Sequence, residues 1–281
     1  MIYLENQVIE MNQFPDGTFS TKLLAPTDES TGKVKKSVTM KWFFRDNSEL
    51  VSLIFITKHL RASGVKNIDL YMPYIPNARQ DRVKNPEDIF TLKYFAQTIN
   101  EMNFRSVRVL DPHSNVSEAL IDRIKIDTPE YMIKLVLDDI AEENEGTGDF
   151  KDKDNIVMFY PDEGAMKRYS GKFKNPYAFG IKKRDWKSGK ILGLDVTGET
   201  SLIPGNDILI VDDICSRGGT FYHSAKKLKE LGAGNIYLYV SHCENTILEG
   251  EVLTSGLIEK VYTTDSIFTK EHEKVEVFEL C

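Results

Sequence analysis

The segment from Ile208 to Thr220 contains the pattern in this chain that most directly predicts chemistry. Two adjacent carboxylates, Asp212 and Asp213, end a run of four apolar β-forming residues, and a turn with Gly218 and Gly219 leads into a helical pattern. Acidic groups at the end of a strand can bind sugar hydroxyls or a metal ion, and N–H groups at the next helix N-terminus can bind a phosphate. The segment therefore predicts a site for a phosphorylated sugar. The simpler alternative is a strand-to-helix turn whose acids cap the helix.

A second polar loop follows the predicted strand at residues 68–72. It contains Arg79, Gln80 and Asp81, and ligands of open α/β sheets bind at such carboxyl ends of strands. Arg79 and a second arginine, Arg82, could bind a polyphosphate through pairs of N–H groups, and the amide and carboxylate could bind a base or a sugar. The alternative is a surface loop held by ion pairs, without a role in chemistry.

Two further loops contain candidate metal ligands. His113 follows the predicted strand at residues 107–110, and Asp162 follows the strand at residues 156–160. Carboxylates are preferred magnesium ligands, whereas imidazole is an uncommon one, so His113 would bind the ion directly or through water. The alternatives are a structural histidine and a helix cap.

Positive charge is concentrated at residues 182–190, where Lys182, Lys183 and Arg184 are consecutive. The segment has no apolar periodicity, which predicts an exposed loop. Transition-state charge on a phosphoryl group is stabilised by cations that close over it and exclude water. The segment is therefore a candidate catalytic lid, and the alternative is a loop that only increases solubility.

Strand and helix patterns alternate along the chain, which predicts an α/β fold with parallel sheets. The acidic segment 138–155 contains little that could be buried and predicts a linker or surface excursion between two domains. The predicted strands are residues 68–72, 107–110, 156–160, 177–181, 208–211 and 236–240, and the predicted helices include residues 50–60 and 92–102.

The composition limits the class of protein. The 281-residue chain has a formal net charge of -7, which argues against nucleic acid or an anionic membrane as a general partner. Its three cysteines lack the spacing of a metal site or a disulfide framework, and the first residues lack the pattern of a signal peptide. No apolar run reaches bilayer length. A cytoplasmic protein is expected.

Several segments, taken in order, resemble the signature motifs of ribose-phosphate diphosphokinases, also called phosphoribosyl-pyrophosphate synthetases. The resemblance extends over nearly the whole chain. The segments that resemble the adenine loop, the ATP-binding segment, the Asp-Leu-His motif, the Asp-Ala-Gly-Gly motif and the ribose-phosphate loop are Phe14–Gly17, Pro73–Arg82, Asp111–His113, Asp162–Gly164 and Asp212–Thr220, and the closing segments are Ser241-His242 and Val261–Ile267.

The resemblance implies two phosphoribosyltransferase-like domains, at residues 1–140 and 141–281, each with a mainly parallel sheet flanked by helices. It implies transfer of the β,γ-diphosphoryl group of ATP to O1 of ribose 5-phosphate, giving phosphoribosyl pyrophosphate and AMP, with Mg²⁺ as the cofactor. The partners would be ATP and a ribose-phosphate acceptor. A neighbouring subunit supplies the adenine loop in this family, so a homo-oligomer, a dimer or larger, is expected.

The same resemblance assigns the site residues. ATP would be bound by Phe14, Asp16, Thr18, Arg79, Gln80 and Asp81, and the metal ion by His113 and Asp162. The ribose phosphate would be bound by Asp212, Asp213, Ser216, Arg217, Gly218, Gly219 and Thr220. The catalytic residues would be Lys182, Lys183 and Arg184, and either lysine can occupy the catalytic position, depending on the alignment of the lid.

The chain also departs from the family pattern. Thr18 replaces the usual Glu, and Ser216-Arg217 replaces the usual Asp-Thr, which adds a cation where the 5-phosphate should bind. The adenine loop lies so near residue 1 that most of the family's first strand-helix unit is lacking. Three alternatives remain open: diphosphoryl transfer to a larger 5-substituted ribose such as ADP-ribose in NAD salvage, a phosphoribosyltransferase, and a non-catalytic regulatory relative.

Overall fold

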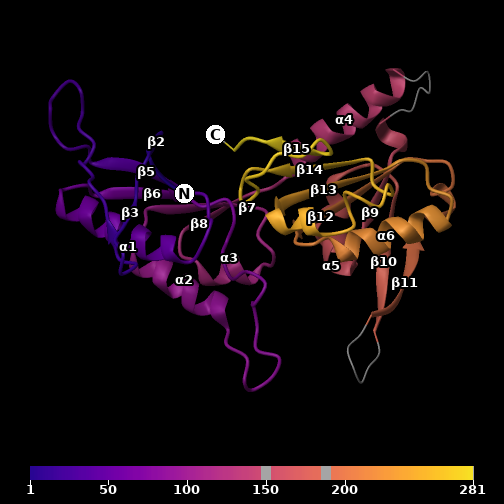
Figure 1. Ribbon diagram of the computed structural model, residues 1–281, viewed down its shortest axis with the longest axis horizontal. Coiled ribbons are helices and arrows are strands. Elements are labelled where there is room, and N and C mark those ends of the chain that lie inside the picture. Colours follow the sequence, from indigo (N-terminus) through magenta and orange to yellow (C-terminus); the bar gives the residue numbers. More distant parts are fainter. Residues whose placement is uncertain (147–152, 185–190, 281) are drawn as a thin grey trace. The chain divides into compact units, whose positions relative to one another are not determined.

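The computed structural model describes residues 1–146, 153–184 and 191–280, with the backbone alone for residues 144–146, 182–184 and 191–194. The chain divides into two compact units, Met1–Thr128 (unit 1) and Pro129–Cys281 (unit 2). Each unit has its own sheet and helices (Figure 1). The α/β fold with two mainly parallel sheets is therefore confirmed.

Unit 1 contains a six-stranded sheet in the order β2-β1-β5-β6-β7-β8. Strands β5 to β8 are parallel, whereas β1 and β2 add antiparallel pairs at the β5 edge. A separate hairpin is formed by β3 (Asn12–Gln13) and β4 (Phe19–Ser20). The strands of the sheet are β1 (Ile2–Leu4), β2 (Gln7–Val8), β5 (Ser37–Trp42), β6 (Asn67–Tyr71), β7 (Ser106–Leu110) and β8 (Ile124–Asp127).

Three helices connect the parallel strands of unit 1: α1 (Ser48–Ala62), α2 (Thr91–Glu101) and α3 (Val116–Leu120). The buried side chains of α1 and α2 recur at helical spacing and pack in one core with inward-facing residues of the strands. Such crossovers bring the carboxyl ends of the parallel strands to the same edge of the sheet, so the loops after β6 and β7 are neighbours.

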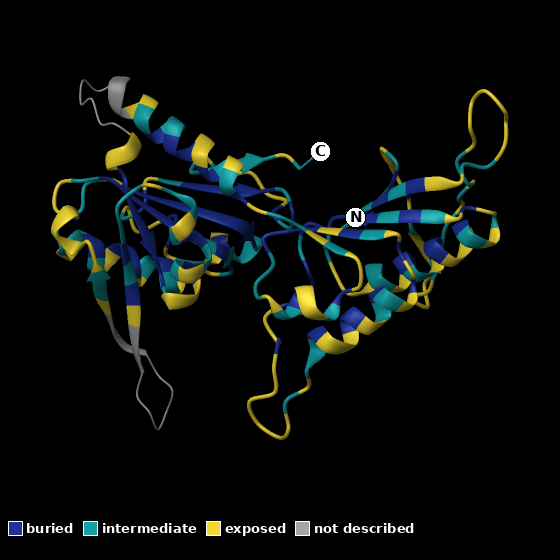
Figure 2. Cartoon of the chain, turned by 180° about the vertical axis from the view of Figure 1, so that it is seen from behind, coloured by how far each residue is buried: buried dark blue, intermediate teal, exposed yellow. Residues whose placement is uncertain are grey.

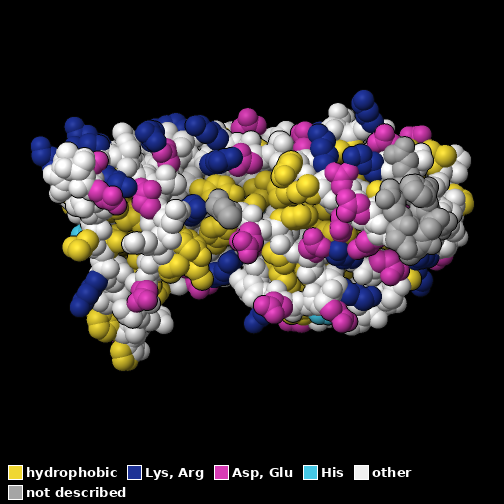
Figure 3. All heavy atoms as spheres, turned by 90° about the horizontal axis from the view of Figure 1, so that it is seen from above, with side chains coloured by type: hydrophobic (Ala, Val, Ile, Leu, Met, Phe, Trp, Pro, Cys, Tyr) yellow, Lys and Arg dark blue, Asp and Glu magenta, His cyan; other side chains and the backbone are white. Residues whose placement is uncertain are grey.

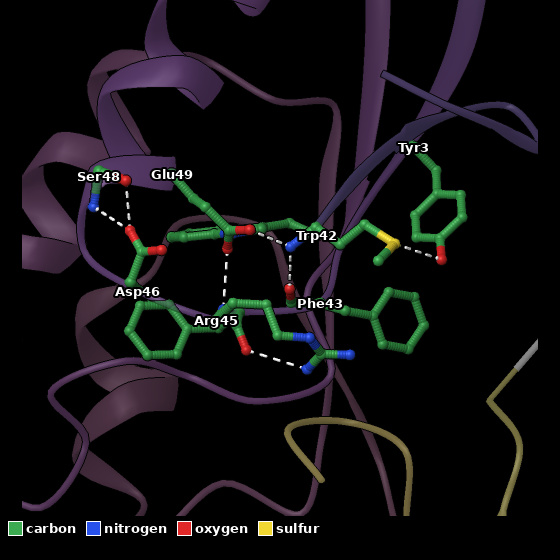
Figure 4. A network of polar contacts seen from close by, with 9 residues as sticks. Tyr3, Trp42, Phe43, Arg45, Asp46, Ser48 and Glu49 are labelled. Atoms are coloured by element: carbon green, nitrogen blue, oxygen red, sulfur yellow. Dashed lines mark hydrogen bonds and ion pairs between the residues drawn. The ribbon is translucent and has the colours of Figure 1, made fainter. Parts of the chain in front are cut away.

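Glu49 fixes the start of α1 against the end of β5 (Figure 4). Its carboxylate accepts hydrogen bonds from Trp42 Nε1 at 2.9 Å and from the backbone N–H of Arg45 at 2.9 Å. It also pairs with the amino group of Met1. These contacts join the start of β1, the end of β5 and α1.

Unit 2 contains a seven-stranded sheet in the order β11-β10-β9-β12-β13-β14-β15. All neighbours are parallel except the β10–β11 hairpin. The strands are β9 (Val157–Tyr160), β10 (Tyr177–Arg184), β11 (Ile191–Gly198), β12 (Ile208–Cys215), β13 (Ile236–Cys243), β14 (Lys260–Thr264) and β15 (Val275–Phe278).

The sheet of unit 2 is covered on both faces, and its central strands are buried (Figure 2). On β12, Ile208 and Ile210 pack in one core with the helix α6 (Gly219–Glu230). Leu209 and Val211 pack in the other core with α4 (Glu130–Gly146) and α5 (Glu163–Tyr169). Burial on both faces explains why β12 begins as an uninterrupted apolar run. Four short 3₁₀ helices complete the unit: η1 (Lys153–Asn155), η2 (Ser170–Lys172), η3 (Thr200–Leu202) and η4 (Asn245–Glu249).

Three sequence-based predictions on the connections differ from the structure. The linker expected at residues 138–155 is wrong at its start, because residues 138–146 continue α4 and Ile140 is fully buried. The chain divides at Thr128, earlier than the predicted boundary at residue 140. The lid was expected to begin at Lys182, but β10 continues to Arg184 and pairs with β11, and residues 185–190 lie outside the described residues.

Acidic side chains lie among basic ones over both units in the view of Figure 3. This mixture is in keeping with a small net charge of -7. None of the helices in the described ranges is both long enough and apolar enough to cross a membrane.

The burial of Ile140 gives a direct test of the continued helix α4. Ile140→Ala should lower the free energy of unfolding by about 2–5 kcal/mol, because it removes a fully buried side chain. The exposed Glu142→Ala on the same helix is the matched control. Urea unfolding followed by circular dichroism measures both variants. Equal stabilities of the two variants would mean that residues 138–146 are not packed.

Candidate functional site

The predicted ribose-phosphate loop connects β12 to α6 through a left-handed glycine. Gly218 has φ 77° and precedes the first residue of α6. A Cβ on Gly218 would lie 2.2 Å from Cγ2 of Val252, so the chain can turn here only with glycine. The first N–H groups of a helix have no partners within the helix and carry partial positive charge. The turn therefore presents donors suited to a phosphate.

The two acids at the end of β12 have different surroundings. Asp213 is 4% exposed and its carboxylate lies 3.3 Å from Nη1 of Arg168 on α5. Asp212 is half-buried, and its Oδ1 accepts a hydrogen bond from the backbone N–H of Asp213 at 2.9 Å. Asp213 therefore has an arginine as a countercharge.

Asp162 lies near this pair of acids. Burial, the neighbouring Asp213 and then the charge of Asp162 raise the pKa of Asp212 well above its usual value. The parallel register of β9 and β12 explains the proximity, since Phe159 is the partner of Ile210 and both strands end shortly afterwards. The structure thus brings together three of the predicted acids of unit 2.

Asp162 also caps a helix. It is the N-cap of α5, and its Oδ1 accepts a hydrogen bond from the backbone N–H of Ala165 at 3.1 Å. The alternative reading of Asp162 as a cap is therefore confirmed. The cap orients the carboxylate at the strand end beside Asp212, so it is compatible with a further role there.

The loop after β6 in unit 1 contains an internally paired acid. Asp81 is 7% exposed, and Arg82 donates to its two oxygens at 2.7 and 2.9 Å. The hydrogen bond from Arg82 and the charge of His113 hold the pKa of Asp81 below its usual value. Asp81 therefore lies beside the loop after β7, and the structure brings the candidate ATP-binding and metal-binding loops of unit 1 together.

Gln80 is also engaged within unit 1. Its side-chain Oε1 accepts a hydrogen bond from the hydroxyl of Thr91, the first residue of α2, at 2.7 Å. In addition, Gln80 O accepts from the N–H of Leu92 at 3.4 Å. These contacts connect the loop after β6 to the start of α2. They therefore also restrain Arg79, which is the residue before Gln80.

The predicted adenine loop is the turn of the β3–β4 hairpin. The N–H of Phe14 donates to Thr18 O at 2.8 Å, and Asp16 Oδ1 accepts from the N–H and the hydroxyl of Thr18 at 3.0 and 2.7 Å. These hydrogen bonds lower the pKa of Asp16. Phe14 is 55% exposed. The turn is therefore ordered by its own residues and presents an aromatic ring to solvent.

The three predicted catalytic residues are at the end of β10. Lys182, Lys183 and Arg184 pair with Leu194, Gly193 and Ile191 of β11. Their side chains lie outside the described residues. The register thus places their backbone in the antiparallel β10–β11 pair.

The predicted metal ligands His113 and Asp162 belong to different units. Within the described part of the chain, no three His, Cys, Asp or Glu side chains form a group that could hold a metal ion by themselves. Mg²⁺ usually keeps several waters and binds one or two carboxylates together with substrate phosphates. The gathered carboxylates of unit 2 fit that mode of binding.

Arg168 is the site residue that the sequence did not single out. Its only sequence signal was membership of the basic pair Lys167-Arg168, which is equally typical of an exposed helix face. In the structure, its guanidinium lies 5.6 Å from the centroid of the Tyr169 ring and also meets Asp213. The contact between α5 and the end of β12 could be found only from the fold.

Comparison with known proteins adds independent information. Residues 2–102 match the model of the N-terminal domain of ribose phosphate pyrophosphokinase. A ribose-phosphate pyrophosphokinase of Campylobacter jejuni is 26% identical over 269 residues, covering 93% of this chain and 80% of that protein. One from Rhizobium meliloti is 29% identical over 230 residues, covering 80% of this chain and 69% of that protein. A phosphoribosylpyrophosphate synthetase structure from Mycobacterium smegmatis shares the fold, with a TM-score of 0.74 and 19% identity over 97% of this chain and 86% of its own.

The acids that lie close to Asp212 are expected to lower the stability of the folded, ligand-free protein, although they are candidate functional residues. Ionisation of Asp212 destabilises the folded protein, because its pKa is higher in the folded state than the unfolded value of about 3.9. Asp212→Asn should therefore raise the melting temperature of the ligand-free, metal-free protein at pH 8. The gain should shrink as the pH falls and disappear well below about 4, where the carboxyl is protonated in both the folded and the unfolded state.

Differential scanning calorimetry across that pH range checks this prediction, with the exposed Asp122→Asn as the control. A melting temperature of Asp212→Asn at or below that of the wild type at pH 8 would refute the electrostatic description of the site.

Proposed function

We propose that the chain is a member of the ribose-phosphate pyrophosphokinase family, to which its residues 2–102 and its relatives are similar, and that it is an ATP-dependent diphosphokinase acting on a ribose phosphate. O1 of ribose 5-phosphate attacks the β-phosphorus of ATP in line. The bond between the β-phosphorus and the oxygen it shares with the α-phosphorus breaks, so the products are AMP and phosphoribosyl pyrophosphate. The O1 proton is released.

The observation that carries this proposal is the arrangement at the end of β12. Two acids lie in the second half of β12, and the left-handed Gly218 and the N-terminus of α6 follow three residues after that strand ends. Carboxylates can accept hydrogen bonds from the ribose hydroxyls of the acceptor, while the N–H groups after Arg217 bind its 5-phosphate. Arg168 would keep Asp213 ionised and oriented, so that the pair presents one defined geometry to the sugar.

Magnesium would be held jointly by protein and nucleotide. Asp162 is the proposed ligand in unit 2 and His113 is the proposed ligand in unit 1, each directly or through water, with phosphate oxygens completing the coordination. The closeness of Asp162 to Asp212 supports this proposal, because a divalent cation would offset the repulsion between these acids. The bound ion would supply charge neutralisation for the diphosphoryl group.

Nucleotide binding is proposed for residues of unit 1. Arg79 and Gln80 would bind the phosphates and the sugar or base, and Asp81 would contribute by holding Arg82 in a fixed orientation. Phe14, Asp16 and Thr18 would contact the adenine.

The exposure of the Phe14 ring supports a contribution of this loop to the site of a second copy, so we propose a homodimer or larger assembly. Light scattering at assay concentration checks this, and a fully active monomer would refute it.

A second acceptor class is favoured by one observation. Arg217 is 73% exposed beside the phosphate loop and adds a cation that could bind a further phosphate. This feature supports an acceptor with an extended 5-substituent, such as ADP-ribose, in the same reaction.

We propose the cytoplasm as the compartment, because the chain has buried free thiols at Cys215 and Cys243. Cell fractionation would test that assignment.

The reaction can be tested by phosphorus NMR on the protein mixed with ATP, Mg²⁺ and either ribose 5-phosphate or ADP-ribose. AMP and a new 1-diphosphate should appear together with ribose 5-phosphate, and Asp212→Ala should abolish both. Strong selectivity for ribose 5-phosphate would remove the second acceptor class, and the reverse selectivity would replace the first.

Two outcomes would contradict the diphosphokinase proposal. One is nucleotide turnover without a new 1-diphosphate. The other is base-dependent release of diphosphate in the absence of ATP, which is the reaction of a phosphoribosyltransferase.

The proposed lid has its own test. Lys182→Ala or Lys183→Ala, whichever removes the catalytic lysine, should lower kcat and kcat/KM together by at least roughly a hundredfold, because a preorganised charge is lost from the transition state. The other variant and the exposed control Lys174→Ala should be mild. Steady-state kinetics measures all three, and the KM for ATP should change little. Near-normal kcat in both lid variants would remove these residues from the mechanism.

A further inference from the structure

The segment after β13 packs directly on the ribose-phosphate loop. The N–H of Glu244 donates to Cys215 O at 2.8 Å. A Cβ on Gly250 would lie only 1.8 Å from the carbonyl oxygen of Arg217, and the site of a Cβ on Gly218 lies against Val252. Residues 244–252, which contain η4, therefore form a wall that follows the loop from the end of β12 to the start of α6.

This wall contributes a carboxylate to the loop. Nη2 of Arg217 donates to Oε2 of Glu249 at 2.9 Å, and the two side chains are 73% and 59% exposed. Exposed ion pairs of this kind contribute little to stability, so their members separate at small cost. The close approach of Gly250 to Arg217 keeps the two charged residues next to each other whatever their rotamers.

We propose that Glu249 is a positioning residue, which holds the Arg217 guanidinium in the empty site and competes for it with the phosphate of the acceptor. This inference rests on the proposed function, because it assumes that the phosphate binds at the β12–α6 loop. Glu249 itself does not contact the reacting atoms. Its effect on the acceptor is transmitted through Arg217.

The competition has a definite direction. A charge-assisted Arg–phosphate contact is stronger than an exposed Arg–carboxylate pair, so Arg217 exchanges Glu249 for the phosphate when the acceptor binds. Because the Arg217–Glu249 pair must be broken before an anion can bind Arg217, the affinity of the loop for any anion is lowered by about twofold to fivefold. Glu249 therefore limits the contribution of Arg217 to acceptor binding.

Isothermal titration calorimetry with ribose 5-phosphate, and separately with inorganic phosphate, tests the proposal on the full-length protein without ATP. Four variants are compared with the wild type: Glu249→Gln, Arg217→Gln, the double variant and Glu230→Gln. Glu230→Gln is the matched control, because it removes an exposed carboxylate from the exposed Lys227–Glu230 pair on α6.

The expected pattern is specific to competition. Glu249→Gln should bind both ligands about twofold to fivefold more tightly, and Arg217→Gln should bind them about tenfold or more weakly. In the Arg217→Gln background, the further change Glu249→Gln should have less than about a twofold effect, because its partner is gone. Glu230→Gln should match the wild type.

Either of two results overturns the proposal: no gain in affinity from Glu249→Gln, or an equal gain with and without Arg217, which would mean that the Glu249 charge acts on the ligand directly. The outcome is separable from that of the proposed function. If Glu249→Gln tightens phosphate binding only when Arg217 is present but the protein shows no turnover, only the diphosphokinase proposal is refuted. If turnover is normal but the effect of Glu249→Gln does not depend on Arg217, only the role of Glu249 is refuted.

Discussion

Repulsion among the acids at the carboxyl ends of β9 and β12 is the constraint on which the account of unit 2 depends. The parallel register of the two strands brings Asp162 close to Asp212, and Asp213 follows directly. Arg168 offsets the charge of Asp213, while the pKa of Asp212 remains raised. A ligand that donates hydrogen bonds to these acids, or a divalent cation, stabilises the protein by relieving this repulsion.

The rest of unit 2 supports this concentration of charge. Two hydrophobic cores cover both faces of the sheet, and they hold β12 rigidly between β9 and β13. The left-handed Gly218 then turns the chain three residues after β12 ends, so that the N–H donors at the start of α6 come soon after the acids in the chain. The wall at residues 244–252 packs against the same turn. The carboxylates of the acids, which accept hydrogen bonds, and the N–H groups at the start of α6, which donate them, are thus held in place by the packing of the surrounding chain rather than by attraction to each other.

The sequence predicted what is local and could not predict what depends on distant contacts. The strand and helix around the phosphate loop are confirmed, because an apolar run, a glycine turn and a helical repeat are all adjacent in the chain. The predicted end of that strand at residue 211 is wrong, since β12 continues through both acids to Cys215. The end of α4 was missed, since one buried Ile140 among acidic residues gives little apolar signal. Arg168 was not singled out, because Asp213 meets it only through the pairing of β9 with β12. Asp81 was predicted to bind a ligand, and its carboxylate is engaged by Arg82, which sequence adjacency alone does not indicate.

The central claim is that the loop from Asp212 to Thr220 is the site of the acceptor's phosphate and sugar. A crystal structure of the wild-type protein soaked with ribose 5-phosphate tests it most directly. The account predicts the phosphate within hydrogen-bonding distance of backbone N–H groups between Arg217 and Thr220, and sugar hydroxyls at the acids of β12. Sugar phosphate bound elsewhere, for example at the groove lined by Arg105, Arg123 and Lys125 in unit 1, with the β12–α6 loop unoccupied at saturating concentration, would contradict it.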